Sequence, residues 1–166
     1  MTVDEQIYRH LQEMHQERHG WLFIGEMRTG TGYGQFSEQS IDAWAIQAWG
    51  KRVGHIAIKN LMRAFEIKVS RSDAVRELRN PDKRWYAYAV SHEFYFVAPA
   101  GLFLVGELAE DDGLIELFHD GGLRVTKKAK IRSPMPPRWS FVASLVRRQV
   151  EIIDRLKAKA GENCHE

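Results

Sequence analysis

The sequence predicts a single α/β domain in which helices pack on a central sheet. Two observations support this fold class. A helical hydrophobic period at the start of the chain gives way to strand-like segments, then to a helix, more short strands and a closing helix. The chain of 166 residues is also long enough to bury one core without disulfides. We therefore expect one domain over residues 1–166, with a core at about 20–135 and an added C-terminal helix at about 138–160.

The first half of the chain predicts one helix followed by three strands. The helix covers residues 3–18, where apolar residues recur at helical spacing, and Gly20 can end it. The glycine-rich stretch Thr29–Gly34 predicts a turn. Three apolar segments have the composition of strands: Trp21–Met27, Ile41–Trp49 and Met62–Val69.

The second half predicts two helical stretches, several short strands and a long closing helix. Ser70 and Asp73 fit a capping box for a helix from about Ser72, and Asn80 can cap a second stretch over Asp82–Val90. Short strands are expected at 94–98, 102–108, 114–118 and 123–128. The closing helix is amphipathic, with an apolar stripe of Phe141, Leu145, Ile152 and Leu156.

Composition limits the chemistry and the location. The only cysteine, Cys164, excludes an intramolecular disulfide and any zinc site built on cysteine. His10, His15 and His19 recur on the polar first helix and are expected to be exposed. No apolar run approaches the roughly 18 residues of a membrane span, and the polar residues 1–20 do not resemble a signal peptide. These features predict a cytoplasmic protein without a membrane partner.

Charge is segregated along the chain. Residues 51–84 carry ten basic against four acidic side chains, and residues 124–166 carry eleven against four, whereas residues 85–123 contain no lysine or arginine. Such segregation can form a positive face for phosphate, although solvated helix surfaces would give the same pattern. The candidate phosphate contacts are Arg71, Arg76, Arg79, Lys83, Arg84, Lys127 and Lys128.

One acid–lysine pair and a second acid upstream could carry out chemistry. On a strand, Glu66 and Lys68 point to the same face, while Phe65, Ile67 and Val69 point into a core. Asp42 lies in an otherwise apolar strand, where an acid is costly unless it is paired or bound to a metal. If these strands are neighbours, Asp42 and Glu66, with the backbone carbonyl of Ile67, form an oxygen site suited to Mg²⁺ or Mn²⁺. An ion pair on an exposed strand is the alternative.

These segments also carry a family resemblance. The most specific segments are Glu66-Ile-Lys-Val-Ser-Arg-Ser-Asp73, the following Leu78-Arg-Asn-Pro-Asp-Lys83, and Phe94-Tyr-Phe-Val-Ala-Pro99. Together with Asp42, their order resembles phage and bacterial PD-(D/E)XK proteins over roughly residues 20–135, and among these the MmcB-like family of predicted DNA-repair nucleases and its phage-encoded relatives. The resemblance implies a restriction-endonuclease-like α-β-β-β-α-β core with a mixed sheet. It also implies Asp42 and Glu66 as metal ligands and Lys68 as the catalytic lysine. Many members use a further upstream acid, for which Glu26 is the candidate.

The expected function is therefore a Mg²⁺-dependent deoxyribonuclease, with Mn²⁺ able to substitute and RNA not excluded as a substrate. Two alternatives stay open: a nuclease fold that binds nucleic acid without cleaving it, and a phage-type interaction protein. A homodimer is plausible, but no residue argues for one. The basic stretch between Asp42 and Glu66, with Lys51, Arg52 and His55, is either a hairpin that touches DNA or an elongated turn.

Overall fold

The protein is built on one six-stranded mixed sheet. The computed structural model describes residues 1–16, 19–28, 40–49 and 58–162. The strands lie side by side in chain order: β1 (Trp21–Arg28), β2 (Ser40–Gln47), β3 (Met62–Ile67), β4 (Glu93–Pro99), β5 (Gly113–Leu117) and β6 (Leu123–Lys127). The first three strands are antiparallel, β3, β4 and β5 are parallel, and β6 is antiparallel to β5. The predicted turn at Thr29–Gly34 and the basic residues Lys51, Arg52 and His55 lie outside the described residues.

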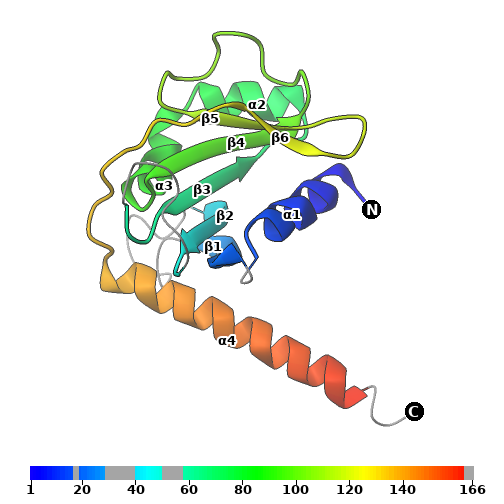
Figure 1. Cartoon of the computed structure of the whole chain (residues 1–166), viewed down its shortest axis with the longest axis vertical. Helices are drawn as coiled ribbons and strands as arrows, with labels where there is room; N and C mark the ends of the chain where they lie inside the picture. Colours follow the sequence, from blue (N-terminus) through cyan, green and yellow to red (C-terminus); the bar gives the residue numbers. More distant parts are fainter. Residues whose placement is uncertain (17–18, 29–39, 50–57, 163–166) are drawn as a thin grey trace.

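Helices cover both faces of the sheet, which confirms the α/β class (Figure 1). On one face, α1 (Val3–Met14) buries Ile7 and Leu11 in a core with residues such as Phe65. The other face carries a second core, to which α2 (Arg71–Leu78), α3 (Trp85–Ala89) and the start of α4 (Trp139–Glu162) contribute. The segment from α2 to α3 crosses over the sheet, which allows β3 and β4 to be parallel. The element order α1-β1-β2-β3-α2-β4 is the one that the resemblance implies.

The structure confirms some predicted helix ends and corrects others. Ser70 caps α2 as expected, since its hydroxyl accepts a hydrogen bond from the Asp73 N–H. The Asp73 carboxylate does not complete a capping box but pairs with Arg76 and Lys68. The expected helix over 82–90 is a 3-10 turn, η2 (Pro81–Arg84), followed by α3, and Asn80 makes no side-chain capping bond.

The strand predicted over 102–108 is wrong. The Glu107 carboxylate accepts the Leu104 N–H at 2.8 Å, and the Glu107 N–H donates to the Leu104 carbonyl at 3.2 Å, so the segment folds back on itself. Arg71 holds this turn through Glu107 and the Leu102 carbonyl. The backbone groups that a strand would offer to a neighbour are used locally.

Two further side chains differ from their predicted burial. Val69 follows the last residue of β3 and is exposed instead of reaching the core. His15 is buried at the end of α1, where its ring packs against Trp21 and its Nδ1 lies 2.9 Å from the Leu11 carbonyl.

Within the described ranges, no helix combines the length and the apolar character needed to cross a membrane.

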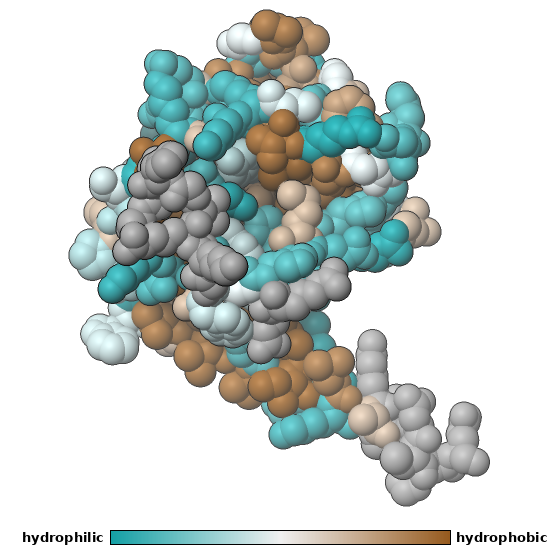
Figure 2. Space-filling model, viewed as in Figure 1, coloured by the Kyte–Doolittle hydropathy of each residue, from teal (hydrophilic) through white to brown (hydrophobic). Residues whose placement is uncertain are grey.

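The closing helix is attached to the domain mainly at its beginning. Phe141 is buried against Trp44 and Tyr86, while the C-terminal end of the helix projects away from the sheet (Figure 1). Leu156 is exposed, so the predicted apolar stripe is wrong at that position. Apolar side chains gather along the outside of the helix (Figure 2), and they are Val146, Val150, Ile153 and Leu156.

Candidate active site

The carboxylate of Asp42 lies where β2 and β3 separate. The antiparallel backbone pairing of these strands ends at Ala43 and Phe65. Beyond that pair, Asp42 Oδ2 accepts a hydrogen bond from the Ile67 N–H at 2.8 Å. The acid thus satisfies a backbone donor at the end of the ladder, which explains how an otherwise apolar strand accommodates it.

Glu66 and Lys68 lie together on the face of the sheet that α2 covers, as their spacing predicts. Lys68 Nζ donates to Glu66 Oε1 at 2.5 Å, and the two side chains are only 8% and 14% exposed. Two acids of α2 complete the surroundings of the amine: Asp73 Oδ2 is 3.7 Å away and Glu77 Oε2 is 3.8 Å away. Lys68 therefore faces three carboxylates, with Asp42 close enough to influence its charge.

Burial and crowded negative charge raise the pKa of both predicted metal ligands. Burial and the charge of Asp42 outweigh the attraction of Lys68, and the pKa of Glu66 rises to about 7. Burial also raises the pKa of Asp42, although the Ile67 N–H and Lys68 favour its anion. Burial lowers the pKa of Lys68, but the surrounding carboxylates more than reverse this, and the pKa lies above its ordinary value. Lys68 is therefore protonated at neutral pH. Its single positive charge does not offset the effect of burial and negative charge on Asp42 and Glu66.

Glu77 and Asp73 belong to this cluster but do not follow from the acid–lysine motif. The buried Glu77 is 3.5 Å from Lys83 and 3.6 Å from Arg84. A local signal exists, because Asp73 and Glu77 are spaced i and i+4 on the helix directly after the strand. That spacing places both acids on one helix face, and only the packing of α2 on β3 turns that face toward Lys68.

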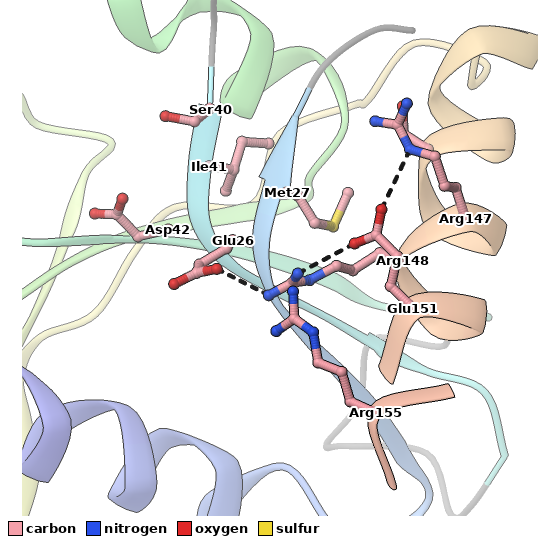
Figure 3. Close-up of a pocket in the computed structure, with 10 residues that line it drawn as sticks. Glu26, Met27, Ser40, Ile41, Asp42, Arg147, Arg148, Glu151 and Arg155 are labelled. Atoms are coloured by element: carbon pink, nitrogen blue, oxygen red, sulfur yellow. Dashed lines mark hydrogen bonds and ion pairs between the residues drawn. The ribbon is translucent and has the colours of Figure 1, made fainter. Parts of the chain in front are cut away.

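Asp42 borders two cavities. The α1 cavity, of about 510 Å³, is lined by Asp4, Glu5, Tyr8, Glu26, Asp42, Ile67, Val69 and Asp73. The α4 cavity, of about 620 Å³, lies between β1, β2 and α4 (Figure 3), and its lining includes Glu26, Ser40, Asp42, Arg147, Arg148 and Arg155. Of the two predicted carboxylate ligands, Asp42 therefore borders open space, whereas Glu66 lines neither cavity.

Glu26 lies beside Asp42 but outside the buried cluster. Its backbone adopts a positive φ of 51°, between the pairs Gly25–Ala43 and Met27–Ile41. Its side chain is 79% exposed and accepts from Arg148 Nη2 at 2.8 Å. The catalytic role of Glu26 stays a prediction, and in this structure its carboxylate is paired with a cation of α4.

Three of the predicted phosphate contacts have structural partners instead. Arg84 is 6% exposed and donates to the Glu77 carbonyl at 2.6 Å and the Tyr88 hydroxyl at 3.0 Å. Arg71 forms a two-pronged pair with Glu107. Lys127 donates to the carbonyls of Ala109, Glu110 and Asp112. The prediction that Arg84 contacts phosphate is wrong, because Arg84 is buried. For Arg71 and Lys127 the role stays a prediction, and in this structure both bond to groups of the protein.

The remaining four predicted contacts are on the surface. Arg76 pairs with Asp73, and Lys83 lies 3.5 Å from Glu77, but both are largely exposed. Arg79 and Lys128 are exposed as well. These four cations are exposed and so accessible to a phosphate, and that role stays a prediction.

The chemistry of the buried cluster fits a hard divalent cation. The carboxylates of Asp42 and Glu66 both have raised pKa values, the charge of Asp42 contributes to the shift of Glu66, and a cation bound between them would favour their ionised forms. Residues 1–16, 19–28, 40–49 and 58–162 contain no group of three or more His, Cys, Asp or Glu placed to hold a metal. A metal here would rest on Asp42, Glu66 and a backbone carbonyl such as that of Ile67.

Comparisons with known proteins support the fold but do not identify an activity. The sequence matches no protein-family model and no curated protein. The structure is similar to that of SPO1766, a protein of unknown function from Silicibacter pomeroyi, with a TM-score of 0.62. The similarity covers 98% of this chain and 94% of that chain at 14% sequence identity, so it establishes a shared fold alone.

Proposed function

We propose that this chain is a metal-dependent nuclease that hydrolyses phosphodiester bonds in DNA. The observation that carries the proposal is the buried arrangement of Asp42, Glu66 and Lys68 at the point where β2 and β3 separate. An acid pair with raised pKa values and a protonated lysine, next to open space, suits catalysis better than simple ion pairing.

Asp42 and Glu66, with the carbonyl of Ile67, are the residues that would hold Mg²⁺ or Mn²⁺. A bound divalent ion would supply Lewis acidity to a phosphoryl oxygen and lower the pKa of a coordinated water. Asp42 keeps its orientation through the Ile67 N–H. This contact leaves its other carboxylate oxygen available for a cation.

Lys68 acts as a hydrogen-bond donor and a fixed positive charge. Its raised pKa makes it a poor base at neutral pH, so it orients the attacking water and offsets negative charge that develops on the phosphate. Asp73 and Glu77 are positioning residues, because both lie within 4 Å of the amine on the side of α2, and the charge of Glu77 also favours its protonated form.

Cleavage assays with matched variants test this function. Labelled linear, nicked, branched and single-stranded DNA, with RNA as a parallel substrate, is incubated with Mg²⁺, Mn²⁺ or EDTA. The wild-type protein should cleave DNA only with metal, and Lys68→Ala and Asp42→Asn should be inactive. Arg9→Ala serves as control, since Arg9 is an exposed cation of α1 that lies 3.8 Å from Glu13 and lines neither cavity.

Circular dichroism confirms that each variant is folded. A folded wild-type protein that binds these nucleic acids but cleaves none of them would replace the nuclease by a nuclease-fold binding protein. Full activity of folded Lys68→Ala would remove the catalytic role of the lysine.

A further inference from the structure

One face of α4 lines the α4 cavity with polar residues. Ser144, the adjacent Arg147 and Arg148, Glu151 and Arg155 recur at intervals of three or four residues, so they lie on one side of the helix as a single stripe. Three of the five are arginines. Across the cavity, the stripe faces Glu26, Ser40 and Asp42 (Figure 3). The helix therefore places cations next to an acid of the proposed active site.

The orientation of α4 is the reverse of that of an ordinary surface helix, which turns its apolar side inward. Beyond its first turns, α4 exposes Val146, Val150 and Ile153, while the arginine stripe faces the domain (Figure 2). Burial of apolar surface does not explain this arrangement. A role for the arginines inside the cavity does.

The three arginines are not equivalent. Arg148 is 18% exposed and donates to the Gly25 carbonyl at 3.2 Å, to Glu26 and to Glu151 at 3.3 Å. These contacts join α4 to β1 and occupy the hydrogen-bond donors of the Arg148 guanidinium group. Arg147 is half-exposed, with its Nε 3.8 Å from Glu151, a weak contact of a solvated pair. Arg155 is exposed and forms no ion pair with any residue of the described ranges.

The two cavities beside Asp42 differ in charge. The α1 cavity is lined by five carboxylates and no basic residue. Its charge repels a phosphate backbone. The α4 cavity has three guanidinium groups beside the three carboxylates of Glu26, Asp42 and Glu151. Two of the guanidinium groups have donors to spare, and guanidinium groups bind phosphate through two parallel hydrogen bonds.

We propose that the α4 cavity holds the phosphate backbone of a nucleic-acid strand beside the reacting phosphate, with Arg147 and Arg155 as the phosphate ligands. The proposal rests on the proposed nuclease function, since it places the strand relative to Asp42. Arg148 is a positioning residue that keeps α4 against β1. The α1 cavity is left for groups other than the backbone.

The test measures binding without cleavage. Fluorescence anisotropy with a short labelled single-stranded DNA in EDTA compares wild type, Arg147→Ala/Arg155→Ala and a control, Arg9→Ala/Lys157→Ala. The control removes the same two charges from exposed positions outside both cavities, and Arg9 is 3.8 Å from Glu13, as Arg147 is from Glu151. The same DNA with uncharged methylphosphonate linkages, and inorganic phosphate as competitor, separate backbone binding from binding of a free anion.

We expect the cavity variant to bind about tenfold more weakly than wild type, and the control to stay within about twofold. The slope of log affinity against log salt should become shallower by about 1.4, or roughly 0.7 for each lost phosphate contact on a single strand. The methylphosphonate strand should bind equally weakly to wild type and cavity variant. Equal loss in both double variants, or none in either, overturns the phosphate site.

The two proposals fail separately in this design. A wild-type protein that binds DNA through Arg147 and Arg155 but cleaves nothing with Mg²⁺ keeps the phosphate site and loses the nuclease. A protein that cleaves DNA while the cavity variant binds and cleaves like wild type keeps the nuclease and loses the site. Competition by inorganic phosphate as strong as by the strand would reassign the cavity to a free anion.

Discussion

Asp42 Oδ2 accepts the Ile67 N–H at 2.8 Å and thereby joins β2 to β3 just past their last backbone pair. The same carboxylate borders both cavities and raises the pKa of Glu66. One side chain thus has a structural contact and an electrostatic effect. Substitutions can separate the two.

Asp42→Asn should be more stable than Asp42→Ala. The asparagine carbonyl can still accept the Ile67 N–H, whereas alanine leaves this donor without a partner at a cost of about 1–3 kcal/mol. Urea unfolding at neutral pH measures the difference. Equal free energies of unfolding for the two variants would show that the hydrogen bond does not stabilise the fold. Independently of their stability, both variants should lose metal-dependent cleavage.

Glu66→Gln should stabilise the protein above neutral pH. The pKa of Glu66 is about 7 in the folded protein against an ordinary value of 4.5 in the unfolded chain. The folded state therefore binds more protons between these values, and its stability falls as pH rises from about 4.5 to 7, by about 3 kcal/mol at most. The free-energy difference between variant and wild type should grow across this window and level off above it.

The pH dependence of stability must be compared between Glu66→Gln and wild type, because His15 also titrates differently in the folded and unfolded states. Burial lowers the pKa of His15 from 6.5 to about 4, so its contribution is present above 6.5 and is lost as pH falls through 4. As pH rises, the contribution of Glu66 to stability thus falls while that of His15 rises, over overlapping pH ranges. The stability of the wild-type protein alone would therefore change little with pH. A pH-independent difference between Glu66→Gln and wild type would contradict the raised pKa of Glu66.

Mg²⁺ should raise the melting temperature of the wild-type protein and not that of Asp42→Asn or Glu66→Gln. Binding to the folded state alone stabilises it by about 2.7 kcal/mol at a hundred times the dissociation constant. Differential scanning calorimetry at pH 8 with Mg²⁺ or EDTA measures the shift without any substrate. A shift of equal size in all three proteins would place the ion elsewhere.

Glu26→Gly should be less destabilising than Glu26→Ala. The φ of 51° at Glu26 favours glycine, and a left-handed conformation costs other residues about 1 kcal/mol or more. Both variants lose the pair with Arg148, so their difference isolates the backbone. Thermal unfolding of the two variants provides the measurement, and an alanine variant as stable as the glycine variant would remove the strain.

Arg84→Ala should unfold far more easily than Arg79→Ala. Arg84 is buried, bonded to the Glu77 carbonyl and the Tyr88 hydroxyl, and lies over the Phe96 ring. Loss of a buried charged partner costs about 3–5 kcal/mol, whereas exposed positions usually change stability by about 0.5 kcal/mol or less. Chemical denaturation at pH 7 distinguishes the two, and similar stabilities would contradict a structural role for Arg84.

The proximity of the candidate active-site residues was predictable, because it follows from strand geometry. Glu66 and Lys68 share a face by their spacing, and Asp42 needed a partner because an acid is costly in an apolar strand. Burial of individual cations was not predictable in the same way. Arg84 and Arg79 stand in the same basic segment, yet only Arg84 is enclosed by Glu77, Tyr88 and Phe96.

The sequence by itself determined the order of helices and strands, apart from the strand expected at 102–108, and the pairing of Glu66 with Lys68 at the end of β3, because hydrophobic periodicity and strand alternation are local properties. Tertiary structure decided which charges meet. Arg148 and Glu26 are 122 residues apart in the chain and bond across the α4 cavity, and Glu77 reaches Lys68 only because α2 packs on β3. Contacts of this kind depend on how elements dock, and no local pattern encodes the docking of α4 that turns its arginines toward Asp42.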